Sequence, residues 1–111
     1  MKATTNSDQL HGTLDMLVLK VLEGGPLHGY AIAVRLERMS KDVLSVEEGS
    51  LYPALYRMER RGWLGSSWAL TDTGRRARVY EVTPAGRKQL ESEEVRWKAI
   101  TAAVGKILKL A

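Results

Sequence analysis

Six arginines in the middle of the chain are the residues whose type and spacing point most directly to chemistry. They form two clusters, Arg57, Arg60, Arg61 and, further on, Arg75, Arg76, Arg78. The planar guanidinium of arginine makes paired hydrogen bonds with phosphate groups and with the edge of guanine. Residues 46–90 hold eight Lys or Arg and five Asp or Glu, whereas residues 1–45 hold five of each. Most of the net charge of +4 (17 − 13) therefore lies around the two clusters, which favours binding to nucleic acid.

Groups that could perform catalysis are sparse and scattered. The two histidines, His11 and His28, lie 17 residues apart, and the chain has no cysteine. Acidic residues are direct neighbours at 47–48 and at 93–94, and neighbouring side chains diverge on a helix. The sequence contains no phosphate-binding loop, zinc-protease motif or nucleophile elbow. We predict a protein that is not an enzyme and that has no cofactor and no metal site.

Length and composition indicate a single globular domain. The chain has 111 residues, of which 44% are hydrophobic and 27% charged, close to the averages of folded domains. No apolar run approaches the roughly 20 residues that cross a bilayer. The first residues, MKATTNSDQLHG, place Asp8 and His11 where a secretory signal would be apolar. The sequence therefore predicts a cytoplasmic protein with no membrane partner.

Three helices are predicted after a polar, flexible N-terminal arm at residues 1–9. Apolar residues recur at helical spacing in residues 10–23, 29–39 and 48–61. The expected buried stripes are Leu14, Leu17, Val18, Val21, Leu22 in the first helix, Ile32, Leu36, Met39 in the second and Leu51, Leu55, Met58 in the third. Pro53 cannot donate a hydrogen bond to Gly49, so the third helix is expected to start close before Pro53 or to bend there.

A hairpin of two short strands is predicted after the helices. Residues 63–69 and 75–83 are the expected strands, and residues 70–74 have the composition of a turn. Three helices followed by a hairpin are the order of a winged helix-turn-helix domain, here residues 10–83. The sequence therefore predicts a mainly α-helical fold with a small β-hairpin.

In a winged helix, the third helix enters the major groove of DNA and the hairpin lies beside it. The outward face of the third helix is expected to carry Ser50, Pro53, Ala54, Arg57 and Arg61. At the hairpin tip, Gly74 lets the backbone approach phosphate, while Arg75 and Arg76 neutralise its charge.

A long C-terminal helix is predicted for residues 84–111, with Thr83 as its N-cap and Pro84 at its first position. Apolar residues recur along it at spacings of three, four and seven, as in a coiled coil. They are Leu90, Trp97, Ile100, Val104, Ile107 and Ala111. Such a helix is about 40 Å long, so a core this small cannot cover its whole apolar stripe. This favours a homodimer that pairs through the helix. The alternative is an amphipathic helix folded back on its own core.

Four strings of the sequence resemble motifs of the PadR-like family of bacterial transcriptional regulators. Residues 25–30 read GPLHGY, as does the family signature, and residues 49–59 (GSLYPALYRME) are similar to its recognition helix. Residues 74–80 (GRRARVY) resemble its wing, and residues 82–87 (VTPAGR) resemble the entry to its last helix. The resemblance covers about residues 10–98 with the strings in the family's order.

The resemblance implies which residues contact DNA. Tyr30, Ser50 and Tyr52 match family positions at the DNA surface, and Arg75 and Arg76 match wing residues that contact the backbone or the minor groove. It also implies an ATGT half-site facing ACAT and membership of the smaller subgroup, in which the last helix mainly dimerises.

Two departures from the family pattern concern the wing. Ala77 and Val79 replace a polar residue and an aromatic residue, which could weaken the contact of the wing. The neighbouring Arg78 either binds DNA or supports the hairpin.

A small hydrophobic or aromatic effector is a further implication of the resemblance. In the smaller subgroup a tryptophan of the last helix can stack on a flat ligand, and Trp97 matches its place, with Met16 and Ile100 as expected neighbours. The alternative is that Trp97 only packs in the dimer interface.

Together these features predict a sequence-specific DNA-binding repressor that binds an inverted repeat as a homodimer. The alternative is a winged-helix module that binds another protein and never contacts DNA. Such a module would have an apolar or acidic outer face on its third helix, which Arg57 and Arg61 disfavour.

Overall fold

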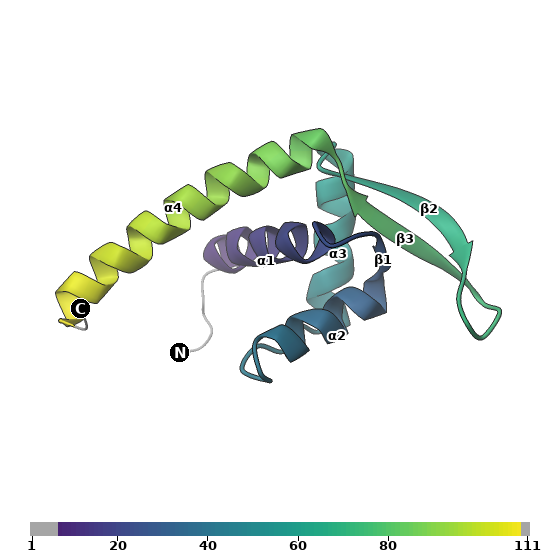
Figure 1. Cartoon of the computed structure of the whole chain (residues 1–111), viewed down its shortest axis with the longest axis horizontal. Coiled ribbons are helices and arrows are strands. Elements are labelled where there is room, and N and C mark those ends of the chain that lie inside the picture. Colours follow the sequence, from purple (N-terminus) through teal and green to yellow (C-terminus); the bar gives the residue numbers. More distant parts are fainter. Residues whose placement is uncertain (1–6, 110–111) are drawn as a thin grey trace.

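The computed structural model describes residues 7–109, and they form four helices and a small antiparallel sheet (Figure 1). The elements are α1 (Ser7–Leu22), β1 (Leu27–His28), α2 (Gly29–Met39), α3 (Glu48–Arg60), β2 (Leu64–Leu70), β3 (Arg76–Val82) and α4 (Pro84–Leu108). The predicted fold class, mainly α-helical with a β-hairpin, is confirmed. Of the predicted arm at 1–9, residues 1–6 lie outside the described part, and α1 already begins at Ser7. Ala111 also lies outside it.

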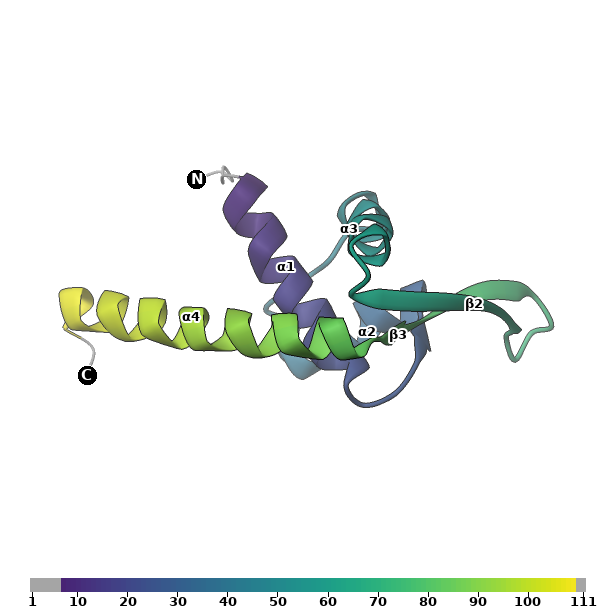
Figure 2. The same ribbon diagram turned by 90° about the horizontal axis from the view of Figure 1, so that it is seen from above.

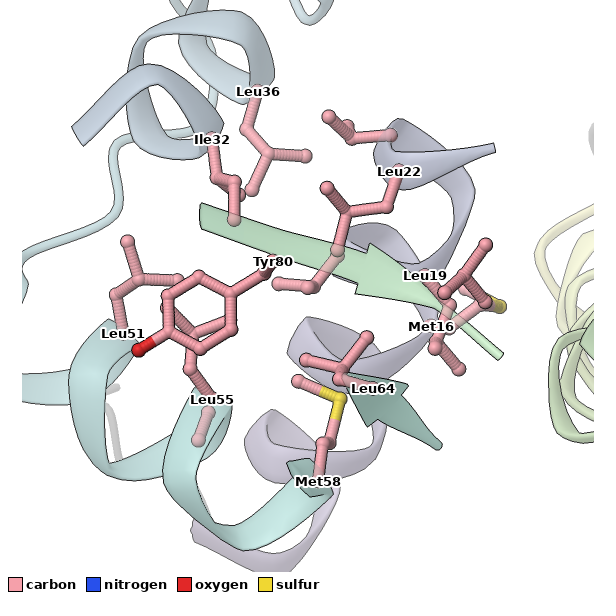
Figure 3. Close-up of a cluster of buried hydrophobic side chains, with 14 of the residues drawn as sticks. Met16, Leu19, Leu22, Ile32, Leu36, Leu51, Leu55, Met58, Leu64 and Tyr80 are labelled. Atoms are coloured by element: carbon pink, nitrogen blue, oxygen red, sulfur yellow. The ribbon is translucent and has the colours of Figure 1, made fainter. Parts of the chain in front are cut away.

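The core is made where α1, α2 and α3 bring their apolar stripes together (Figure 3). Val18 of α1, Ile32 of α2 and Leu55 of α3 are fully buried, as their helical spacing predicts. Leu19 is fully buried as well, although the predicted stripe left it out. Two predictions at the edges of the stripes are wrong. Ala54 is fully buried because it lies one turn from Leu51 on the inward face, whereas Met39, the last residue of α2, is 61% exposed.

Three strands form the sheet in the order β1-β3-β2, and both pairings are antiparallel. The hairpin predicted from sequence is present as β2 and β3, paired from Leu64 opposite Val82 to Leu70 opposite Arg76. The strand β1 was not predicted, since two residues are too few to show a period. Its pairing of Leu27 with Tyr80 ties the start of α2 to the hairpin.

The hairpin has a buried base and an exposed outer half. On the face that meets the core, Leu64, Tyr80 and Val82 are buried. Because side chains alternate along a strand, Trp68 and its partner Arg78 lie on this same face, further out, where the helices no longer cover it. We call β2, β3 and their connecting turn the wing, which projects from the body in Figures 1 and 2.

The end of α3 and the start of α4 are joined at the base of the wing. Beyond Arg60, Gly62 donates to the carbonyl of Glu59 and Trp63 to that of Met58, which is a Schellman motif that turns the chain into β2. The predicted cap at Thr83 is confirmed, since its hydroxyl accepts a hydrogen bond from the Gly86 amide at 3.0 Å. The same hydroxyl donates to the carbonyl of Gly62 at 2.6 Å.

Gly86 is a point of close backbone approach in this joint. A Cβ atom there would lie 2.2 Å from the carbonyl oxygen of Trp63 and 2.8 Å from a methyl group of Val82. The first turn of α4 therefore packs directly on the base of the wing, and glycine makes that contact sterically allowed.

Only the first part of α4 packs on the body of the chain. Leu90 is 1% exposed inside the core, and Glu94 pairs with Lys20 of α1 at 3.3 Å. The rest of α4 projects past the body (Figure 2), and its apolar residues from Val95 onward are exposed. This projection and the wing explain a radius of gyration of 15.1 Å, against about 13 Å for a compact chain of this length. The alternative of a helix folded back along its whole length does not hold.

Candidate nucleic-acid interface

The N-terminal half of α3 is largely exposed to solvent. Ser50 and Pro53 are exposed there, as predicted, and Tyr52 is 40% exposed. Pro53 lies inside the helix without breaking it, because α3 starts at Glu48, and the carbonyl that Pro53 cannot reach is that of Gly49. This half of the helix therefore presents the small side chains of Ser50 and Pro53 to solvent, together with the acidic Glu48 of the first turn and the ring of Tyr52.

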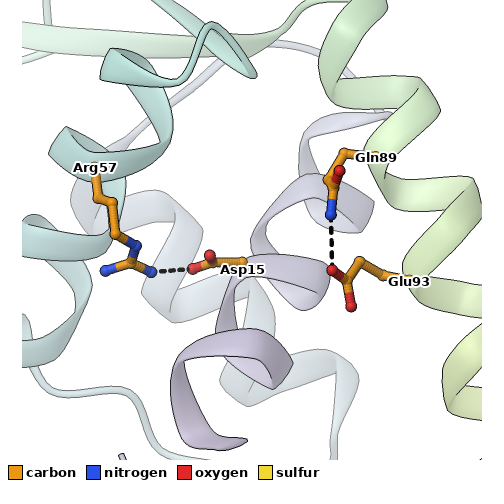
Figure 4. Close-up of polar contacts among 4 residues, drawn as sticks. All are labelled: Asp15, Arg57, Gln89 and Glu93. Carbon is orange, nitrogen blue, oxygen red and sulfur yellow. Dashed lines mark hydrogen bonds and ion pairs between the residues drawn. The ribbon is translucent and has the colours of Figure 1, made fainter. Parts of the chain in front are cut away.

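Arg57 lies on α3 but is directed toward α1 (Figure 4), contrary to the predicted outward position. Its guanidinium nitrogen is 2.5 Å from a carboxylate oxygen of Asp15, and the two side chains are 28% and 10% exposed. A carboxylate this deeply buried needs a cation or several hydrogen bonds nearby. Arg57 therefore joins α3 to α1 and is not a free cation of the exposed surface.

Arg61 lies just beyond α3, beside the base of the wing. It is exposed, and its guanidinium carbon is 5.2 Å from the ring centroid of Trp63. This distance is within the range of a cation–π contact. Arg61 is thus placed away from the N-terminal half of α3 that carries Ser50 and Pro53.

The arginines of the wing are held by an aromatic ring and by α3. The guanidinium carbons of Arg76 and Arg78 lie 4.9 Å and 5.2 Å from the ring centroid of Trp68. Arg78 is also 3.5 Å from a carboxylate oxygen of Glu59, which accepts a hydrogen bond from Ser66 at 2.6 Å. Arg78 therefore supports the hairpin while its guanidinium remains exposed, so the two predicted roles are compatible.

A surface cleft of about 650 Å³ lies between the wing and the N-terminal ends of α2 and α3. The predicted DNA-contacting residues that line it are Tyr30, Tyr52, Arg75, Arg76 and Arg78. Trp68 lines it as well, and sequence reasoning missed this residue. The feature that points to Trp68 is its position opposite Arg78 in the hairpin, and this position is known only once the strand register is known. We call this hollow the wing cleft.

Tyr52 of α3 and Tyr80 of β3 both have pKa values raised above that of an ordinary tyrosine. Burial raises the pKa of Tyr52, and the nearby Glu48 raises it further. Burial also raises the pKa of Tyr80, and Glu59 adds to the effect, while Arg78 opposes it. The ring of Tyr52 lies against Gly29, where a Cβ atom would come within 2.5 Å of it. Tyr52 is therefore a fixed, neutral hydroxyl group at the edge of the wing cleft.

The residues predicted for the dimer interface and for an effector separate into two environments. Trp97, Ile100, Val104 and Ile107 are 44–77% exposed along α4. Leu90 and Met16 are instead buried in the core of the chain itself, at 1% and 7% exposure. Leu90 therefore cannot serve as an exposed interface residue, contrary to the prediction, and Met16 is not open to a ligand beside Trp97 in this structure.

Two general features bear on other kinds of site. Within residues 7–109, no three His, Asp or Glu side chains gather in a way that could hold a metal ion. None of the helices in that described part is long and apolar enough to cross a membrane.

The helix order, the wing and the basic cleft beside α3 define a winged-helix domain of the DNA-binding kind. Residues 18–92 match the profile of the transcriptional regulator PadR-like family. The chain belongs to this family of transcriptional regulators.

Solved structures of regulators share the whole architecture. A transcriptional regulator from Clostridium thermocellum superimposes with a TM-score of 0.80 at 26% identity, covering 89% of this chain and 96% of that one. A PadR family regulator from Eggerthella lenta has a TM-score of 0.74 at 32% identity, covering 93% of this chain and 88% of that one.

Sequence relatives are similar over shorter stretches. A transcriptional regulator of Mycobacterium tuberculosis is 42% identical over 57 residues, which are 51% of this chain and 52% of that protein. An uncharacterised 37.1 kDa protein from a transposon of Streptomyces fradiae is 46% identical over 78 residues, 70% of this chain. The chain thus spans about half of the first relative and about a fifth, 21%, of the second.

Proposed function

We propose that this regulator is a repressor that binds an inverted-repeat DNA operator as a homodimer in the cytoplasm. The observation that carries the proposal is the wing cleft, which three arginines and three tyrosines line between the wing and the exposed start of α3. Guanidinium and phenol groups are donors suited to phosphate oxygens. A DNA backbone in this cleft would place the adjoining major groove against α3.

In this arrangement, α3 and the wing have different tasks. Ser50 and Pro53 are small and exposed, so α3 can approach base edges closely. Arg75 and Arg76 neutralise phosphates, which supplies affinity without sequence information. Substitutions at Ser50 or Pro53 are therefore expected to change sequence preference more than they change non-specific affinity.

The exposed part of α4 supports the homodimer. Trp97, Ile100, Val104 and Ile107 form an apolar stripe without cover from the body of the chain. Pairing with the same stripe of a second copy would bury it and set two α3 helices on one face of the DNA. A small hydrophobic or aromatic effector would act beside Trp97, where it would compete with or reshape this pairing.

The test is a titration of fluorescent duplexes of about 30 base pairs, enough for two half-sites. One duplex carries ATGT facing ACAT, the other a scrambled sequence, and both are titrated at two salt concentrations. Tighter binding of one dimer to the repeat, weakened by salt, supports the proposal. Equal binding to both duplexes rejects this operator, and no binding at low salt favours the protein-interaction module.

Replacing the apolar stripe tests the dimer separately. Sedimentation equilibrium of Val104→Glu should give monomers if α4 pairs, because two like charges would face each other in the interface. Ala102→Glu adds the same single charge at an exposed position on the opposite side of α4 and controls for the effect of charge alone. A dimeric Val104→Glu variant would reject α4 as the interface.

A further inference from the structure

Trp68 is a large aromatic residue in a place where the fold does not need one. It is 55% exposed in the outer half of the wing, beyond the part of the hairpin that covers the core. Exposed tryptophan is costly in solubility and gives the core no burial. Its ring does have neighbours, because the guanidinium groups of Arg76 and Arg78 both lie within about 5 Å of its centroid.

Two cations on one ring need a reason, since their charges repel each other. Each guanidinium gains a cation–π contact with the indole, and Arg78 gains a further partner in Glu59 at 3.5 Å. Long arginine side chains on a bare hairpin would otherwise sample many rotamers. The ring therefore fixes two positive groups on one side of the wing cleft before anything binds there.

We infer that Trp68 is a positioning residue for DNA binding: it holds Arg76 and Arg78 as a preformed clamp for the phosphates of a DNA strand in the wing cleft. The inference rests on the proposed function and adds to it a residue that contributes no charge and no hydrogen bond to the clamp. Its contribution is preorganisation, because the arginines lose less rotational freedom when they bind.

The wing itself offers a control that separates charge from positioning. Arg75 lies at the tip, is exposed and lines the same cleft, but it is not one of the two arginines stacked on Trp68. Removing Arg75 takes away a cation. Removing Trp68 keeps every cation of the wing but takes away the ring against which Arg76 and Arg78 lie.

The experiment uses the full chain and a duplex of arbitrary sequence, because a phosphate clamp does not depend on the operator. Binding is measured by fluorescence anisotropy over a range of salt concentrations. Trp68→Ala should weaken binding about tenfold, while the slope of log affinity against log salt stays as in the wild type. Arg75→Ala should lower that slope by about 0.9 for each phosphate that the variant no longer neutralises. Trp68→Phe, which keeps a ring, should weaken binding only about twofold.

A double-mutant cycle decides whether the ring acts through the arginines. In an Arg76→Ala/Arg78→Ala background, Trp68→Ala should have almost no further effect, whereas in an Arg75→Ala background its full tenfold loss should remain. An equal loss in both backgrounds would overturn the positioning role. Val43→Ala, at an 80% exposed apolar residue between α2 and α3, should bind like the wild type and controls for loss of surface area.

Failure of the inference can be told apart from failure of the proposed function. A wild-type chain that binds no duplex at low salt refutes DNA binding as a whole. A wild-type chain that binds, together with a Trp68→Ala variant of equal affinity, refutes the clamp alone. Thermal unfolding of Trp68→Ala monitored by circular dichroism should match the wild type, because the residue lies outside the core cluster.

Discussion

The two arginine clusters look equivalent in the sequence, but the structure turns one member of the first cluster inward, while every arginine of the second stays exposed. In α3, Arg57 is turned inward against Asp15 and is 28% exposed. In the wing, Arg76 and Arg78 stay exposed and lie against the ring of Trp68. Arg57 thus contributes its cation to the fold, whereas Arg60 and Arg61 remain exposed. The second cluster presents its cations to the wing cleft.

The difference shows that charge alone does not reveal whether an arginine stabilises the fold or is available to bind a ligand. The role depends on the group that each arginine contacts. Arg57 contacts a buried carboxylate on α1, whereas Arg76 contacts an exposed indole on β2. Ser50 and Pro53 in the N-terminal half of α3 are small and uncharged, which suits close contact with base edges, and Glu48 in the first turn adds an exposed acidic group beside them. The cations that can meet phosphate are then the arginines of the wing and the exposed Arg60 and Arg61 at the C-terminal end of α3.

The largest effect is expected from Arg57→Ala, which should lower the free energy of unfolding by about 2–3 kcal/mol. The substitution removes the guanidinium that faces a carboxylate only 10% exposed. Urea unfolding followed by circular dichroism measures it, with Arg75→Ala as the control, expected within about 0.5 kcal/mol of the wild type. Equal stabilities for the two variants would remove the distinction between the clusters.

Next in size is the effect of replacing Arg75 and Arg76 together by alanine. Affinity for any duplex should fall about tenfold or more, and the salt dependence should flatten, because at least two cations per chain no longer meet phosphates. The free energy of unfolding should stay unchanged, whereas Arg57→Ala should lower it. An unaltered salt slope in the anisotropy titration would show that the wing does not contact the backbone.

A smaller effect is expected where the two regions touch, at Glu59. Glu59→Ala removes the acceptor of the Ser66 hydroxyl and the partner of Arg78, and should cost about 1 kcal/mol of stability. Glu81→Ala, on the exposed side of β3, is the matched control and should cost less. The difference in urea midpoints between these two variants measures how firmly α3 holds the wing; no difference would mean that they are not coupled through Glu59.

The smallest effect concerns Tyr80, which lies between α3 and the wing. Its pKa is raised above the ordinary 10.0 mainly by burial, so its stabilising contribution is fully present below pH 10 and is lost as pH rises through the higher folded pKa. Urea unfolding between about pH 8 and pH 11 should therefore show a steeper alkaline loss in the wild type than in Tyr80→Phe. Parallel curves would contradict the assigned burial of the phenol.

Much of the fold was predictable because its helices bury strongly periodic stripes. Residues 29–39 were predicted as a helix and form α2 with the same bounds, and Thr83 caps α4 as its sequence context indicates. The errors occur where local patterns are weak. A two-residue strand such as β1 has no period, and the inward position of Ala54 depends on how α3 is rotated against α1.

The candidate site was predictable only in part, for a physical reason. Residue types at the DNA surface could be proposed from local motifs, and Tyr30, Tyr52 and Arg75 do share one cleft. The contact between Arg57 and Asp15 joins residues 42 positions apart, so no local sequence pattern predicts it. Trp68 was overlooked since its role depends on strand register, which aligns it with Arg78.

The close approach at Gly86 has a consequence for how this sequence can vary. The obstacle to a side chain is the backbone carbonyl of Trp63 at 2.2 Å, which no change of rotamer can move. Position 86 is therefore closed to all nineteen other amino acids, including alanine, the smallest step available to a codon change. In a library of random substitutions selected only for folding, exposed positions of the wing would accept many residues, while the codon for position 86 would keep glycine.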